Sequence, residues 1–287
     1  MKELKPLYPY VGGKGRMIDE FSLYLQQTET YIEPFFGGGA VFCYMKNYKL
    51  ANRYIINDLN PELIKIYKDL QFDASVIYEE FKPLEDRYFS LPIEERQFMF
   101  NMEIDNYNRE MTSGRLLFIL NSSFGSHWCR NQNTGNLSLS SGHNRIKLNA
   151  GPLITKDEFE CWHTALEGVE INCGNYKNIA IPDNSIVFCD PPYLGVDRIY
   201  YKMFSNDEQR ECFNWCCEIS GNATVSVIQT NNTDGKFFEA LLNGASNVKH
   251  FYYRARHSST GKTKAAEEIV MIWNPWFNDP NRFGLYV

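Results

Sequence analysis

Hydrophobic and polar residues alternate along this chain in two patterns, which predict two kinds of secondary structure. Short apolar runs bounded by polar or turn residues are typical of buried strands, and we expect strands ending near residue 34 and over 54–57, 169–173, 185–189 and 223–230. Apolar residues three or four positions apart predict helices over 16–26, 40–46, 153–166 and 207–219. Strands that alternate with helices predict an α/β fold with a mostly parallel sheet.

The last two apolar runs predict a different arrangement. Residues 248–255 and 269–273 have the composition of strands, and the short basic loop 257–266 joins them. A parallel connection needs a dozen or more residues and usually contains a helix, so a short loop favours an antiparallel pair. We therefore expect an antiparallel hairpin at one edge of the sheet.

A long insertion interrupts this pattern after residue 60. Asn60 and Pro61 are typical of the cap and first position of a helix, and amphipathic helical spacing follows at 73–89, 94–110 and 112–120. Residues 121–149 are then rich in Ser, Asn and Gly, and the pair Thr134-Gly135 predicts a hairpin or long loop. The chain thus divides into a main domain, 1–60 and 151–287, and an inserted helical domain, 61–150.

The charge distribution indicates a polyanionic partner, although the net charge is −6. Residues 111–156 and 240–266 contain no Asp or Glu, and each window carries five Lys or Arg residues. Local positive charge matters more than net charge for docking on phosphates. The expected contacts with duplex DNA are Arg130, Arg145, Lys147, Arg256, Lys262 and Lys264, together with Phe124, Trp128 and Asn131, whose rings and amide suit base-step wedging and groove contacts.

The cysteines and the apolar content indicate a reduced, cytoplasmic protein. The eight cysteines include no Cys-x-x-Cys pair and no metal-ligand spacing, so we expect small core residues and no zinc or other metal. No run approaches the roughly 18 apolar residues of a membrane span. The first residues do not form a signal peptide, so we expect no membrane partner.

A glycine-rich turn, residues 37–39, lies between a predicted strand and a predicted helix, and Asp58 follows about 20 positions later. In doubly wound folds such an acid binds ribose hydroxyls, and the glycines let the backbone approach the ligand. Phe42 stands where the dinucleotide fingerprint has its last glycine. A cofactor without a pyrophosphate does not need that glycine, so the pattern favours S-adenosylmethionine over NAD.

The segment Asp190-Pro191-Pro192-Tyr193 follows the predicted strand 185–189, at the sheet edge where open α/β folds bind ligands. The two prolines fix φ and remove two N–H donors, so the turn is stiff and offers carbonyl acceptors. Asp190 adds a second acceptor and Tyr193 adds an aromatic face. Such a group suits the exocyclic amine of a flat base.

With these motifs in this order, the chain resembles the DNA adenine methylase family, the alpha-class (D12 class) adenine-N6 methyltransferases, over nearly its whole length. The matching segments are residues 10–14, 33–42, 57–60, 190–193 and 267–274. The resemblance implies a Rossmann-like methyltransferase fold and methyl transfer from S-adenosylmethionine to a flipped adenine in double-stranded DNA, leaving S-adenosylhomocysteine. It also implies that residues 61–150 recognise the target, with a DNA-reading hairpin near 121–149.

The resemblance implies roles for individual residues as well. The cofactor contacts would be Tyr10, Lys14, Glu33, Phe35, Gly37, Gly39, Asp58 and Asp190. The catalytic set would be Asp190, Pro191, Pro192 and Tyr193, with the Asp190 side chain and the Pro191 carbonyl accepting the two N6 hydrogens. Arg130 is similar to a guanine-contacting arginine. We expect a monomer, or a dimer on DNA.

Three alternatives stay open at this point: methylation of cytosine N4, methylation of RNA or a small molecule, and a non-catalytic DNA-binding module. The recognition sequence also stays open, as does a role in restriction-modification, in an orphan methylase or in a phage.

Overall fold

A computed structural model describes residues 2–10, 12–124, 130–131, 133–142, 152–194, 204–233, 236–245, 247–259 and 262–274, with the backbone alone for 254–259 and 262–267.

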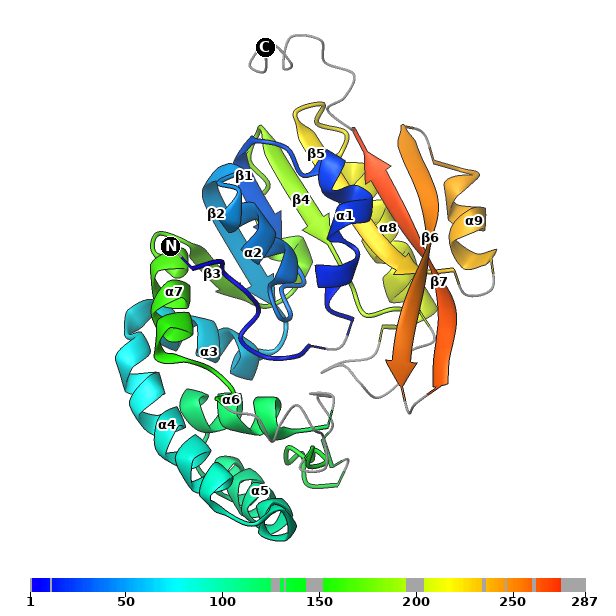
Figure 1. Ribbon diagram of the computed structural model, residues 1–287. Coiled ribbons are helices and arrows are strands. Elements are labelled where there is room, and N and C mark those ends of the chain that lie inside the picture. The colour runs from blue at the N-terminus through cyan, green and yellow to red at the C-terminus, as the bar shows by residue number, and fades with distance from the viewer. Residues whose placement is uncertain are drawn as a thin grey trace.

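The described residues form one seven-stranded sheet with the strand order β3-β2-β1-β4-β5-β7-β6 (Figure 1). Strands β1 to β5 are parallel, and β7 is antiparallel to both β5 and β6. The bounds are β1 Thr28–Glu33, β2 Ala51–Asp58, β3 Glu170–Cys173, β4 Ser185–Cys189, β5 Val225–Asn232, β6 Val248–Ser259 and β7 Lys262–Trp273. This arrangement confirms the predicted mostly parallel sheet with an antiparallel edge hairpin.

Helices cover both faces of the sheet and form a layer beside it (Figure 1). Their bounds are α1 Ile18–Phe21, α2 Ala40–Asn47, α3 Pro61–Phe72, α4 Ala74–Ser90, α5 Ile93–Arg109, α6 Ser113–Ser122, α7 Lys156–Leu166, α8 Asn206–Ile219 and α9 Phe237–Leu242. Short 3₁₀ turns span Lys14–Arg16, Ser22–Tyr24 and Tyr176–Asn178. No helix in the described part of the chain is both long and apolar enough to cross a membrane.

Capping residues begin several of these helices, and the sequence predicts one of them, Asn60. The Asn60 side chain accepts a hydrogen bond from the Glu62 backbone N–H at the start of α3. Helices α7 and α8 each begin with a reciprocal capping box, Thr155 with Glu158 and Ser205 with Glu208.

The predicted helix over 16–26 is wrong, because the structure divides this stretch between 3₁₀ turns and the single turn of α1. Phe21 leaves the helical region, with φ −124° and ψ 5°. Its buried ring stacks on that of Phe188, with centroids 5.3 Å apart, so packing on the sheet overrides the helical spacing.

Alternate residues of the central strands enter two different cores, as the two-residue period of a strand requires. Ile186 and Phe188 belong to the core beneath α1, α2 and α7, whereas Val187 and Cys189 belong to the core beneath α8 and α9. The first core continues through Trp162 into helices α3 to α6. The inserted helices therefore share a core with one face of the sheet, and the division at residues 60 and 150 stays a prediction.

Candidate active site

A cavity of about 260 Å³ lies at the carboxyl ends of β1, β2 and β4. The structure brings all eight predicted cofactor residues to its wall: Tyr10, Lys14, Glu33, Phe35, Gly37, Gly39, Asp58 and Asp190. The strand order reverses between β1 and β4, and open α/β sheets bind ligands at such a point. The carboxyl ends of β4 and β5 face the side of the molecule where α3 to α6 lie (Figure 1).

The glycine loop after β1 packs tightly against its neighbours. Gly37 and Gly39 have φ values of 50° and 67°, which side chains rarely adopt. A Cβ atom at Gly37 would lie 2.7 Å from the Tyr10 ring, and one at Gly39 would lie 2.7 Å from the Phe36 ring. Only glycine fits these two positions, and the loop leaves its backbone open to the cavity.

Asp58 joins the glycine loop to the start of α3. Its carboxylate accepts hydrogen bonds from the backbone N–H groups of Gly37 and Asn60, each at 2.9 Å. Burial raises the pKa of Asp58, and hydrogen bonds from the backbone at Asn60, Gly37 and Leu59 oppose that rise. Asp58, the last residue of β2, therefore lies beside the glycine loop at the wall of the cavity.

Asp190 lies against the cavity and has two close partners. The Lys14 ammonium group is 2.6 Å from Oδ2, and the Thr230 hydroxyl donates to Oδ1 at 2.6 Å. Lys14 also donates to the Gly12 carbonyl at 2.6 Å. Burial raises the pKa of Asp190, whereas Lys14 and Thr230 lower it. Lys14 and Thr230 therefore hold the carboxylate in one orientation.

Glu33 supplies another buried carboxyl group in the same cavity. Its side chain accepts a hydrogen bond from the Tyr31 hydroxyl at 2.8 Å. Burial is the main cause that raises the pKa of Glu33 well above its ordinary value, and the negative charge of Asp190 adds to it. Burial therefore favours the neutral form of Glu33, whereas Asp190 has a cation beside it that favours its ionised form.

Tyr193 lies behind Lys14 and does not line the cavity directly. Its side chain is 6% exposed, and the Lys14 ammonium group is 4.6 Å from the ring centroid. Its hydroxyl donates to the buried carboxylate of Glu268 at 2.9 Å. Sequence reasoning assigned no role to Glu268, although an acid within the apolar run of β7 was an available signal.

A chain of amide hydrogen bonds holds the turn after Asp190. Gln209 donates to the Pro192 carbonyl at 2.6 Å, and Asn231 donates to the Gln209 side-chain oxygen at 2.9 Å. Asn231 also accepts from the backbone N–H of Leu194 at 3.2 Å. All these amide side chains are buried, and sequence reasoning missed both Gln209 and Asn231. The stiffness expected from the two prolines thus has a second, tertiary source.

The structure describes part of the predicted hairpin, and its contact with DNA stays a prediction. Antiparallel bridges join Ser123 to Ser141 and Arg130 to Leu137. The Asn131 side chain accepts from two backbone N–H groups in the intervening turn, at 2.9 and 3.2 Å. Phe124 is 49% exposed beside the first bridge.

The Arg130 guanidinium group forms an ion pair with Glu62 on α3 and also donates to the Gly135 carbonyl. The pair connects the hairpin to the helix that begins beside Asp58. Glu62 was not among the predicted site residues.

The other predicted DNA contacts lie outside the described side chains. Trp128, Arg145 and Lys147 are outside the described residues altogether. The backbone of Arg256, Lys262 and Lys264 belongs to the β6–β7 hairpin at the edge of the sheet. Their contacts with DNA stay predictions.

A mostly parallel α/β sheet with a glycine loop and two carboxylates at the point where its strand order reverses is typical of enzymes that bind nucleosides or nucleotides. The sequence profile of the D12 class N6 adenine-specific DNA methyltransferases matches residues 10–258. The chain therefore belongs to that family and methylates adenine in DNA.

Named relatives agree with this family. The chain is 25% identical to the DNA adenine methylase of Haemophilus influenzae, over 94% of this chain and 93% of that one. It is 25% identical to the type II methyltransferase M.MjaIII of Methanocaldococcus jannaschii, over 95% and 99%. It is 30% identical to the DNA adenine methylase of Salmonella typhi, over 98% and 100%. Adenine-N6 DNA methylation is confirmed over the three alternatives that the sequence left open.

Proposed function

We propose that the cavity holds S-adenosylmethionine and that Asp190 presents the amine of a flipped adenine to it. When bound, this cofactor supplies a methyl group on a positively charged sulfur, which a neutral amine can attack. The convergence of Asp58 and Asp190 on one cavity supports the proposal most strongly. S-adenosylhomocysteine is then the second product.

The residues around the cavity fit an adenosyl group without a phosphate. A carboxylate has about four acceptor positions, and the backbone hydrogen bonds from Gly37 and Asn60 to Asp58 leave acceptor capacity for ribose hydroxyls. Phe35 provides an apolar wall, with its ring 5.0 Å from that of Tyr176. Among the described residues that line the cavity, Lys14 is the one Lys or Arg, and it is paired with Asp190. A pyrophosphate would have no cation of its own here.

Asp190 would act on the substrate amine through hydrogen bonding. Its carboxylate and the Pro191 carbonyl would accept the two N6 hydrogens, which directs the nitrogen lone pair away from them. The negative charge also stabilises the positive charge that grows on nitrogen during transfer. No proton has to leave before the methyl group moves, because the neutral amine is the nucleophile.

Tyr193 would stack on the flipped adenine, a contact of about 1–3 kcal/mol by analogy with other base–aromatic pairs. The ammonium group of Lys14 now lies beside that ring, so the purine would take a place next to Lys14 or displace it. The hydrogen bond to Glu268 fixes the position of the hydroxyl end of the ring. Unpairing and extruding the base costs a few kcal/mol, which stacking partly offsets.

Residues 61–150 would recognise the duplex. Arg130 and Asn131 lie at the hairpin turn, where a guanidinium group and an amide can reach base edges. The basic residues of the β6–β7 hairpin would contact phosphates from the other side of the cavity. One chain contains both parts, so we infer that it acts as a monomer, in the cytoplasm of a bacterial or phage-infected cell.

Calorimetric titration with S-adenosylmethionine tests the cofactor assignment. Asp58→Asn should weaken binding at least tenfold, because a hydrogen bond to a charged group is worth roughly 1.5–3 kcal/mol. Asp105→Asn, at an exposed position of α5, is the matched control and should bind normally. Unchanged affinity in Asp58→Asn would remove Asp58 from the cofactor site.

A further inference from the structure

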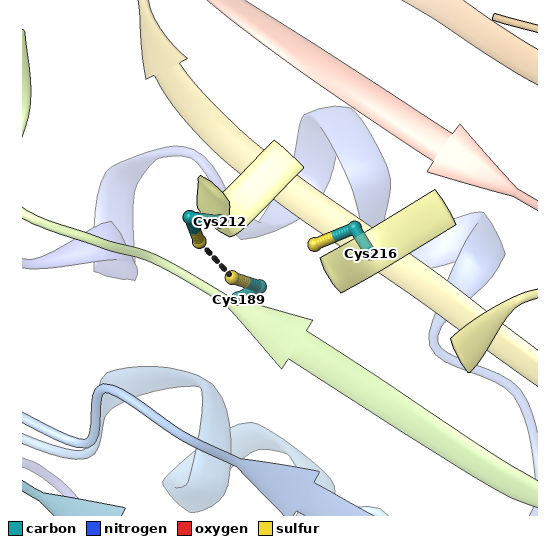
Figure 2. A group of neighbouring side chains, drawn as sticks. All are labelled: Cys189, Cys212 and Cys216. Carbon is teal, nitrogen blue, oxygen red and sulfur yellow. Dashed lines mark hydrogen bonds between the residues drawn. The ribbon is translucent and has the colours of Figure 1, made fainter. Parts of the chain in front are cut away.

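Three cysteines from two distant segments meet behind the Asp190 turn (Figure 2). Cys189 is the last residue of β4, and Cys212 and Cys216 lie one turn apart on α8. Their sulfur atoms all lie within 4.8 Å of one another, and those of Cys189 and Cys212 are 3.5 Å apart. All three side chains are 0% exposed. The cluster is therefore dry and closely gathered.

A fourth polar group faces this cluster from the neighbouring strand. Gln229 pairs with Cys189 across β4 and β5, so both side chains point to the same face of the sheet. Its amide nitrogen is 3.9 Å from the Cys212 sulfur, and its amide oxygen is buried with no hydrogen-bond partner in the described part of the chain. Leaving such an oxygen unpaired costs on the order of 1–3 kcal/mol.

These distances approach those of a tetrahedral metal site. With metal–sulfur bonds of about 2.3 Å, the ligand sulfurs of such a site lie roughly 3.8 Å apart. The observed separations, from 3.5 Å up to at most 4.8 Å, bracket that distance. Turning the Gln229 amide by half a rotation would place its oxygen where the nitrogen now lies, 3.9 Å from Cys212. Shifts of about 1 Å or less would bring the three sulfurs to the spacing of such a site.

We propose that Cys189, Cys212, Cys216 and Gln229 bind one soft divalent metal ion of the zinc type. Thiolate ligands select zinc or cadmium over magnesium and calcium. Each thiol loses its proton to solvent when its sulfur binds the metal, so three protons leave as one divalent ion enters. No oxidant takes part, and no bond between sulfurs forms.

The site would fasten the end of β4 to α8. Cys189 directly precedes Asp190, and α8 also carries Gln209, which holds the Pro192 carbonyl. A bound ion would stabilise the folded chain by mass action and so raise its unfolding temperature. The spacing of these cysteines along the chain gave no sign of a metal site, because 23 positions separate Cys189 from Cys212 and only the fold brings them together.

Cobalt substitution tests the proposal. The full chain is reduced, unfolded with a chelator and refolded with Co²⁺, since the buried sulfurs are not open to solvent in the folded state. The wild-type chain should bind one Co²⁺ and show thiolate-to-cobalt charge-transfer absorption, which Zn²⁺ abolishes on displacement. Its unfolding temperature should rise with either ion.

Two variants make the test specific. Cys216→Ser should weaken Co²⁺ binding at least tenfold, whereas Cys217→Ser, the neighbouring half-buried cysteine outside the cluster, should leave the absorption unchanged. A refolded wild-type chain without this absorption would overturn the proposal, even if Cys216→Ser failed to fold. Absorption lost in Cys217→Ser, or unchanged in Cys216→Ser, would overturn it too.

Discussion

The ammonium group of Lys14 lies 2.6 Å from Oδ2 of Asp190 and so ties the N-terminal segment to the end of β4. Lys14 is 4% exposed, and its second partner is the carbonyl of Gly12. A cation near the start of the chain thus opposes the effect of burial on the pKa of Asp190 and orients the carboxylate proposed to hold the substrate amine.

Replacing Lys14 by Gln should shift the acid limb of the pH–rate profile to higher pH. Burial already raises the pKa of Asp190 and Lys14 opposes that rise, so removing the cation should raise the pKa further, by about one unit or more. Because the ionised carboxylate is the active form, kcat should fall at a higher pH than in the wild type. The measurement is kcat against pH at saturating cofactor and DNA. Lys68→Gln, an exposed change on α3, should leave the profile unmoved, and an unmoved profile in Lys14→Gln would refute the coupling.

Glu33→Gln should make the chain more stable at alkaline pH. The pKa of Glu33 is raised well above its ordinary value of 4.5, mainly by burial. Its protonated form therefore contributes stability below that ordinary value, and this contribution is lost as pH rises through the folded-state pKa. Glutamine keeps the neutral form at every pH.

The free energy of unfolding in urea, measured between about pH 5 and pH 9, checks this expectation. As pH rises, the free energy of unfolding of the variant should increase relative to that of the wild type. The increase should be about 1.4 kcal/mol for each unit by which folding raises the pKa of Glu33. The raised pKa of Asp58 is common to both proteins and cancels in the difference, whereas the repulsion between Asp190 and Glu33 is part of what the difference measures. A constant difference across the range would mean that Glu33 ionises normally.

Gly39→Ala should destabilise the chain more than Gly168→Ala. The two glycines have similar φ values, 67° and 70°, so both variants carry a left-handed backbone penalty of about 1–2 kcal/mol. At Gly39 the new Cβ would also lie 2.7 Å from the Phe36 ring, whereas nothing lies within 4 Å at Gly168. The clash should increase the loss of stability in Gly39→Ala by about 1–3 kcal/mol, measured as the free energy of unfolding in urea. Equal losses of stability in Gly39→Ala and Gly168→Ala would show that the loop can move away from Phe36.

Local chemistry in the sequence predicted much of the fold and the cavity. The Asn60 cap, the glycines of the loop and Asp58 all act within a few residues of their own position or at the end of their own strand. Such signals do not depend on knowing which segments meet. The mostly parallel sheet then follows from the alternation of strands and helices, whereas the strand order comes from the structure alone.

Contacts between distant segments could not be predicted in the same way. Glu268 is 75 positions from Tyr193, and Glu62 is 68 positions from Arg130. The sequence shows Glu62 as an ordinary first-turn residue of α3, and only the fold places it beside the hairpin. The helix expected over 16–26 failed for a related reason, because Phe21 packs on the sheet instead of continuing a helix.

Glu62→Gln should reduce discrimination between DNA targets. Glu62 pairs with Arg130 and orients it, and a guanidinium group in a fixed orientation discriminates bases by about 1–3 kcal/mol. Releasing that orientation should lower the ratio of kcat/KM on the cognate duplex to that on duplexes with one substituted base pair, by about tenfold. Glu79→Gln, an exposed position on α4, serves as the control. An unchanged ratio of kcat/KM values in Glu62→Gln would show that the ion pair with Glu62 does not contribute to discrimination by Arg130.

The most direct test concerns Asp190 itself. Duplex DNA is incubated with S-adenosylmethionine and either wild-type chain or Asp190→Ala, then digested to nucleosides and analysed for N6-methyldeoxyadenosine. The wild-type chain should form this nucleoside, whereas Asp190→Ala should form none and should bind the cofactor more weakly, while remaining folded by circular dichroism. Turnover retained in Asp190→Ala would contradict the account, because the carboxylate at the end of β4 would then not be what presents the amine.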